Sequence, residues 1–165
     1  MPVVLRQGLM ASTTLISTDF GLGAVIAQTR EWRDADHIHL DPIEYVSTAQ
    51  LIAIVRGLTY RQVHESIATL TPEQPDVEDW DIDNLFAYVC HIPNEHRDAL
   101  AGIPDDYVLG IAKQWSKIEE LARMPFTTDD LAAMIKNVRQ LAGAAKESEL
   151  SLLSLIHISE PTRPY

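Results

Sequence analysis

The chain has 165 residues, enough for one domain that buries its own core without disulfides. Hydrophobic residues make up 46% of it and its mean hydropathy is −0.05, values typical of a soluble globular protein. Its 24 Asp and Glu outnumber its 13 Lys and Arg, and the net charge of −11 disfavours binding to nucleic acids or anionic membranes. The single cysteine, Cys90, excludes an internal disulfide and favours a cytoplasmic location. No apolar run reaches the ~18 residues that a membrane span needs.

The first part of the chain predicts short strands with a helix between them. Residues 13–18 form a β-branched run that predicts a strand, and residues 24–32 predict the helix. Residues 37–40 predict a second short strand or an extended approach to Asp41 and Pro42. The strand predictions give the beginning of a small sheet.

Two capping boxes follow, and they predict two short helices joined by a glycine. Ser47 with Gln50 has the spacing of the first box, and Thr59 with Gln62 has that of the second. Gly57 lies between them, where a helix end needs a positive φ. Apolar residues recur at helical spacing after each box, which supports both helices.

The second half of the chain alternates buried segments and helices. Residues 85–92 predict a buried strand, and Asn94 is placed to cap a helix that Gly102 closes. A single apolar stripe over residues 108–122 predicts one long helix from Asp105 or Asp106. Thr127 or Thr128 predicts the cap of a last helix, whose stripe runs over residues 131–145, and a last strand is expected from Leu150 onward. The sum predicts a single helix-rich α+β domain with a small sheet.

The two ends of the chain are interpreted as lying outside the predicted domain. Met10 begins a run that is typical of a natural start, so residues 1–9 are interpreted as an upstream misread or a short frayed extension. The domain itself is predicted over residues 13–152, which leaves residues 1–12 as a doubtful N-terminal extension. Leu153 to Arg163 read LSLIHISEPTR, which resembles the translation of a sequencing-library adapter, and Pro164 and Tyr165 continue it. The resemblance implies that residues 153–165 are an artefactual tail and that the last strand is truncated.

His37, His39 and Asp41 form the most suggestive chemical motif in the chain. Residues two apart on a strand share a face, so two imidazoles and a carboxylate can meet one zinc ion. The motif resembles the opening of the metallo-β-lactamase signature, HxHxDH, but Pro42 stands where the last histidine belongs. The alternative interpretation is a pair of exposed histidines followed by a helix start, with Asp41 as its cap.

Other catalytic and nucleic-acid motifs are incomplete. Gly21 and Gly23 lack the third glycine of a dinucleotide loop, because Ile26 occupies its position. Residues 51–70 have the outline of a helix-turn-helix, but the second helix carries only Arg61 for phosphate contact. The nucleophile elbow GxSxG is absent from the sequence. These gaps favour a non-enzymatic protein without a cofactor.

An acidic segment between the predicted helices and the next strand is the candidate partner-binding site. It contains no Lys or Arg, and an aromatic side chain among carboxylates suits docking to a basic protein surface. A plain solvated loop is the alternative interpretation. The candidate residues are Glu73, Asp76, Glu78, Asp79, Trp80, Asp81 and Asp83.

Several segments together resemble an uncharacterised bacterial family of small acidic proteins. The resemblance lies in Leu40-Asp41-Pro42, in residues 56–63 (RGLTYRQV), in residues 114–121 (QWSKIEEL) and in the last helix, residues 131–145. It implies an α+β fold from which the family's short final strand is missing, and it supplies no activity. The strong acidity and the lack of a complete catalytic motif instead motivate the first hypothesis, a cytoplasmic, non-enzymatic protein that acts through a basic protein partner, of the immunity-like or mobile-element accessory kind. The alternative is a small metal-dependent hydrolase that uses His37, His39 and Asp41.

Overall fold

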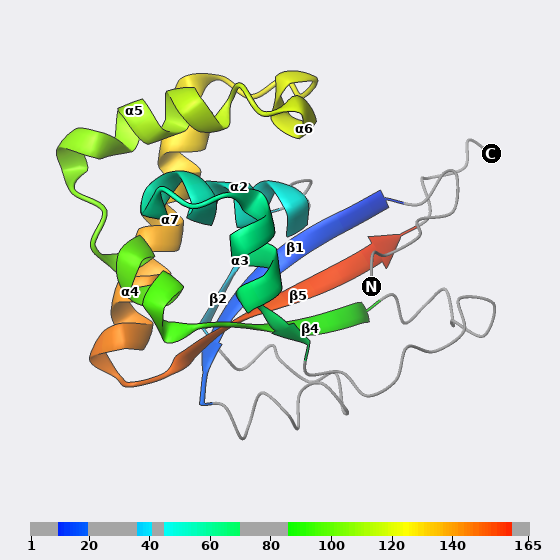
Figure 1. The fold of residues 1–165 in the computed structure, drawn as a ribbon, viewed down its shortest axis with the longest axis vertical. Helices are drawn as coiled ribbons and strands as arrows, with labels where there is room; N and C mark the ends of the chain where they lie inside the picture. The colour runs from blue at the N-terminus through cyan, green and yellow to red at the C-terminus, as the bar shows by residue number, and fades with distance from the viewer. Residues whose placement is uncertain (1–9, 20–35, 41–44, 70–85, 160–165) are drawn as a thin grey trace.

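A five-stranded antiparallel sheet with helices packed against it forms a single α+β domain (Figure 1), as the sequence predicts. The computed structural model describes residues 10–19, 36–40, 45–69 and 86–159. The strands are β1 (Met10–Thr18), β2 (Asp36–His39), β3 (Ala68–Thr69), β4 (Phe86–Ile92) and β5 (Ser151–Ser159). The described helices are α2 (Tyr45–Arg56), α3 (Tyr60–Ser66), α4 (Asn94–Ala101), α5 (Asp105–Trp115), α6 (Glu119–Ala122) and α7 (Thr128–Glu147).

Strand β5 lies at the centre of the sheet, whose order is β2-β1-β5-β4-β3. It pairs with β1 from Met10↔Ser159 to Thr18↔Ser151, and with β4 on its other side. The adapter-like segment, predicted to cut this strand short, instead extends it, and Leu153 and Leu155 are fully buried. A leucine-rich run that is buried on both faces is typical of a central strand.

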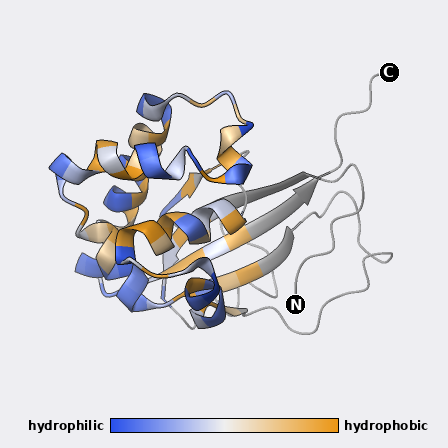
Figure 2. Ribbon diagram, turned by 45° about the horizontal axis from the view of Figure 1, so that its top comes forward, coloured by the Kyte–Doolittle hydropathy of each residue, from blue (hydrophilic) through white to orange (hydrophobic). Residues whose placement is uncertain are grey.

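The helices cover one face of the sheet (Figure 1), and α7 contacts β1, β2 and β5. Leu15, Leu152 and Ile92 lie on β1, β5 and β4, and they join a buried cluster with apolar residues of the helices. Orange and blue residues alternate along the helices in Figure 2, as expected for helices with one buried and one solvated face. None of the helices in the described ranges is long and apolar enough to cross a membrane.

Among the residues that the structure describes, Trp115 has the largest fully buried side chain, and it connects helices to one another. Its indole Nε1 donates a hydrogen bond of 2.8 Å to the carbonyl oxygen of Ser47, which joins α5 to α2. Around it, α7 contributes a long apolar stripe to the same cluster. The buried residues of that stripe are Leu131, Ile135, Val138, Leu141, Ala142 and Ala145.

The second predicted capping box and the predicted last helix are both confirmed. Thr59 Oγ1 accepts from the Gln62 backbone N–H at 3.1 Å, and Gln62 Oε1 accepts from the Thr59 N–H at 2.9 Å. Thr127 and Asp130 form the same reciprocal pair at the start of α7. Gly57 has a φ of +67°, which confirms that it ends α2 in the left-handed region.

Three local predictions are wrong. Ser47 does not cap a helix, because α2 begins at Tyr45 and the Gln50 amide donates to Glu120 Oε2 (3.4 Å) instead of folding back. Asn94 is not a cap either, since Pro93 holds that position without a side-chain hydrogen bond. The long helix predicted to reach residue 122 ends at Trp115. The Ser116 hydroxyl bonds back to the Lys113 carbonyl at 2.7 Å, and α6 begins after a short turn.

Ser154 provides a first test of the central strand. Its hydroxyl is buried and has no hydrogen-bond partner in the part of the chain that the structure describes. We expect Ser154→Ala to keep or raise the free energy of unfolding, by up to about 1 kcal/mol, because an unpaired buried hydroxyl is costly. The neighbouring variant Leu155→Ala should lower it by about 2–5 kcal/mol through the cavity it creates. Urea unfolding followed by circular dichroism measures both free energies. A lower free energy of unfolding for Ser154→Ala would show that the hydroxyl has a stabilising partner.

Candidate functional site

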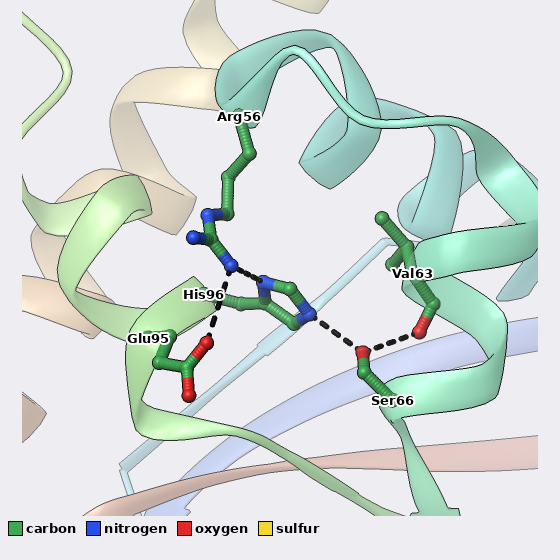
Figure 3. A network of polar contacts seen from close by, with 5 residues as sticks. All are labelled: Arg56, Val63, Ser66, Glu95 and His96. Carbon is green, nitrogen blue, oxygen red and sulfur yellow. Dashed lines mark hydrogen bonds and ion pairs between the residues drawn. The ribbon is translucent and has the colours of Figure 1, made fainter.

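A polar cluster forms where the end of α2, the end of α3 and the start of α4 meet. Arg56 is the last residue of α2, Ser66 is the last residue of α3, and His96 lies in the first turn of α4. Figure 3 shows the imidazole of His96 between the other two side chains, with Glu95 joined to the Arg56 guanidinium by a dashed line. We call Arg56, Ser66, Glu95 and His96 the three-helix cluster.

The hydrogen bonds of this cluster have a defined direction. Arg56 NH1 lies 3.1 Å from His96 Nδ1, and a guanidinium can only donate, so Nδ1 accepts. The proton of the neutral imidazole is therefore on Nε2, which donates to Ser66 Oγ at 2.8 Å. The Ser66 hydroxyl in turn donates to the Val63 carbonyl at 2.6 Å. Every bond in this chain has one donor and one acceptor.

Burial and charge both keep His96 neutral. The residue is only 2% exposed, and burial lowers its pKa because the charged imidazolium is poorly solvated there. The nearby Arg56 guanidinium lowers the pKa further, and Glu95 opposes this by raising it. Glu95 also forms an ion pair with Arg56 at 3.5 Å, although its own side chain is 78% exposed. The net effect favours the uncharged ring.

The Ser66–His96 contact has the distance of a nucleophile–base pair but the opposite polarity. A general base must accept the serine proton, and in a catalytic triad an acceptor holds the other ring nitrogen as N–H. In the three-helix cluster a donor, Arg56, occupies that place, so Nε2 already carries a proton. The Ser66 proton is directed to the Val63 carbonyl instead of the ring. The geometry therefore supports tying three helices together and does not support acyl transfer.

A second group of aromatic side chains surrounds His64 on α3. The Tyr45 hydroxyl lies 3.1 Å from His64 Nδ1, and the Tyr60 ring stacks on the imidazole with centroids 5.7 Å apart. Burial raises the pKa of Tyr45 well above its usual range, with smaller contributions from Cys90 and Tyr60. Burial also raises the pKa of Tyr60. Both phenols are therefore neutral at physiological pH, and the group joins α2 to α3.

The residues predicted for a metal site are only partly within the described chain. His37 lies on β2 opposite Ile16, and His39 is paired with Thr14, while Asp41 lies outside the described residues. Among the residues that the structure describes, no three His, Cys, Asp or Glu side chains are grouped as a metal ion would require. The hydrolase interpretation gains no support from them.

The acidic segment predicted to bind a partner lies within residues 70–85, outside the described ranges. The three-helix cluster, in contrast, was not predicted from the sequence. Ser66 and His96 are 30 positions apart and Arg56 and His96 are 40 apart, so no short motif contains them. The only signal is that Arg56 opens the RGLTYRQV segment of the family resemblance.

Comparison with known proteins does not assign the chain to a group. No protein-family model, curated protein or solved structure matches it. The charge, exposure and hydrogen bonding of its own residues are therefore the properties that indicate what the protein does.

Proposed function

We propose that this protein acts by binding a basic protein partner, as an immunity-like or mobile-element accessory protein, and not by catalysis. The observation that carries the proposal is the outer face of α5, which combines exposed apolar side chains with acidic ones. The net charge of −11 supports it, because a strongly acidic protein attracts a basic partner and associates with it faster.

The large apolar side chains exposed within the described ranges both lie on α5. Tyr107 is 64% exposed and Leu109 is 46% exposed, and they flank the outer face of the helix on either side of the buried Val108. Asp105 and Asp106 precede them in the first turn, and Asp105 pairs with Arg139 at 2.6 Å. Exposed tyrosines are frequent anchors of protein interfaces, and the carboxylates beside this one suit a basic partner.

Gly110 lies between these side chains on the outer face, and the fold itself gives no reason for a glycine there. A Cβ built on Gly110 meets no atom within 4 Å, and its φ is not in the left-handed region. A glycine inside a helix costs about 1 kcal/mol relative to alanine. A partner that approaches the α5 backbone closely gives this residue a role. We call Asp106, Tyr107, Leu109 and Gly110 the α5 face.

A photo-crosslinking amino acid at position 107 tests the proposal in cells of the source organism. We expect one discrete adduct with a basic protein. The yield of this adduct should fall when crosslinking is done at high salt, because salt screens the attraction that brings the two proteins together. Gly110→Trp should remove the adduct by blocking close approach. Gly143→Trp on α7 is the matched control, because Gly143 also has open space at its Cβ, and it should leave the adduct intact.

Two outcomes would argue against the proposal. One is the absence of a discrete adduct, and the other is an adduct that is insensitive to both salt and Gly110→Trp. Replacing the acids of the segment 73–83 by their amides in the same assay tests its predicted part in binding. If the segment contributes to binding, the yield of the adduct should fall, and this yield should depend less steeply on salt concentration.

A further inference from the structure

We propose that the basic partner docks through an α-helix, which runs alongside α5 and places a large apolar side chain over Gly110. This inference rests on the proposed function, because it names the structure that the partner presents to the α5 face. Helix α5 is well placed for such a contact. It packs against α2 and α7, and Figure 1 shows it on the side of these helices that faces away from the sheet.

Gly110 lies at the middle of the outer side of α5. The buried residues of α5 define its inner side, and because successive residues are about 100° apart, the position of Gly110 faces almost directly away from them. Tyr107 and Leu109 lie to either side of it. A Cβ at Gly110 would meet no atom within 4 Å, so a side chain of the partner can reach the backbone of α5 there.

Four exposed residues of α5 surround the space that this side chain of the partner would occupy. Positions i, i+3, i+4 and i+7 of a helix form the hole that receives one side chain of a neighbouring helix. Because Gly110 contributes no side chain, this hole accepts a large apolar group, and the two helix axes can lie at the short end of the usual range of about 8–10 Å. In α5 the four positions are Asp106, Leu109, Gly110 and Lys113.

The backbone of the partner gives the reason why its docking segment is a helix. A segment that lies close over Gly110 buries its peptide groups, and buried N–H and C=O groups need hydrogen-bond partners. The middle of α5 offers none, because its own N–H and C=O groups bond to one another along the helix. A helix satisfies its backbone groups within one segment, whereas a single strand would leave them unpaired against α5.

The charges at the two ends of the hole determine the course of the partner helix. Asp106 lies four residues before Gly110 and Lys113 three residues after it, and both side chains are exposed. Neither forms an ion pair with another residue in the described ranges, whereas Asp105 is paired with Arg139. Two helical turns separate the two free charges, so a partner helix with a basic residue at one end and an acidic one at the other must run alongside α5 to meet both.

Photo-crosslinking from two positions on α5 tests this inference with the full chain. Tyr107 and Gln114 are both exposed and lie two helical turns apart, about 10.5 Å, and each is replaced by the photo-crosslinking amino acid in a separate variant. Mass spectrometry then identifies the partner residues that become attached. In a helix alongside α5, the two attached residues should lie about seven positions apart in the partner's sequence, whereas in an extended strand they would lie about three apart.

Two substitutions test the contact itself. Gly110→Ala should raise the unfolding midpoint, because alanine favours a helix, yet lower the yield of both adducts by filling the space that the partner needs. Asp106→Asn should lower the yield from position 107 by up to about fivefold, which corresponds to the loss of one exposed ion pair. Asp129→Asn is the matched control, because it removes the same charge from the first turn of α7, and it should change the yield much less.

The outcomes distinguish this inference from the proposed function. If position 107 gives no adduct, the proposed function fails and this inference fails with it. If adducts form but the attached residues lie about three positions apart, or are scattered over the partner's sequence, the partner binds the α5 face without a helix. An unchanged yield in Gly110→Ala would overturn the close contact, and equal yields in Asp106→Asn and Asp129→Asn would overturn the course set by the charges. Both results would leave binding itself intact.

Discussion

Trp115→Ala should lower the free energy of unfolding by about 3–5 kcal/mol, a large share of the stability of a domain this size. The indole is fully buried among apolar residues of the helices, so its removal leaves a cavity that the packed surroundings fill only in part. It also removes the hydrogen bond to the Ser47 carbonyl that joins α5 to α2. Urea unfolding followed by circular dichroism measures the loss.

Trp115→Phe separates the two contributions. It keeps much of the buried volume but removes the indole N–H, so we expect a smaller loss than for alanine. About 1 kcal/mol of this loss should come from the hydrogen bond between Trp115 and the Ser47 carbonyl, which is the usual net contribution of one hydrogen bond. An alanine variant within about 1 kcal/mol of the parent would mean that Trp115 is not the packing centre of the helices.

Removing residues 153–165 should abolish cooperative unfolding altogether. The truncation takes away most of β5, the strand that pairs with both β1 and β4, and with it the fully buried Leu153 and Leu155. Strands β1 and β4 then present open edges to solvent, which favours association between chains. Thermal unfolding by circular dichroism and size-exclusion chromatography would show a lost transition and soluble aggregates.

A shorter truncation is the matched control. Removing residues 160–165 leaves all of β5, which ends at Ser159, so the unfolding midpoint should stay close to that of the parent. If the longer truncation unfolds with the same midpoint and cooperativity as the parent, the domain does not need β5. That result would fit the interpretation of residues 153–165 as an artefactual tail.

The sequence predicts those features of the fold that depend on near neighbours. A capping box is complete within four residues, so Thr59 with Gln62 could be recognised directly, as could the cap of α7 at Thr127. The prediction of a capping box at Ser47 and Gln50 was wrong because the Gln50 side chain binds a distant residue, Glu120. The prediction of one long helix to residue 122 was wrong because a continuous apolar stripe does not reveal the turn after Trp115. Strand β3, two residues long, has too short a pattern to be seen.

The candidate site was beyond prediction for the same reason. His96 lies in the first turn of α4, whose sequence, NEHRDALA, indicates a solvated first turn, yet the ring is buried against residues from α2 and α3. Its direction of hydrogen bonding depends on Arg56, which is 40 residues away. Only the tertiary arrangement shows that the group beside the second ring nitrogen of His96 is a donor, Arg56. This distinguishes a contact that joins helices from a catalytic serine–histidine pair.

The place of β5 in the sheet also determines when the protein can fold. Of the strands that the structure describes, the central one is synthesised last, and its partners β1 and β4 have open edges until it emerges from the ribosome. Pairs such as Met10↔Ser159 close a loop of nearly the whole chain, a topology that slows folding. The sheet is therefore completed only once β5 has been made, and until then the nascent chain relies on its helices and its acidic charge to stay in solution.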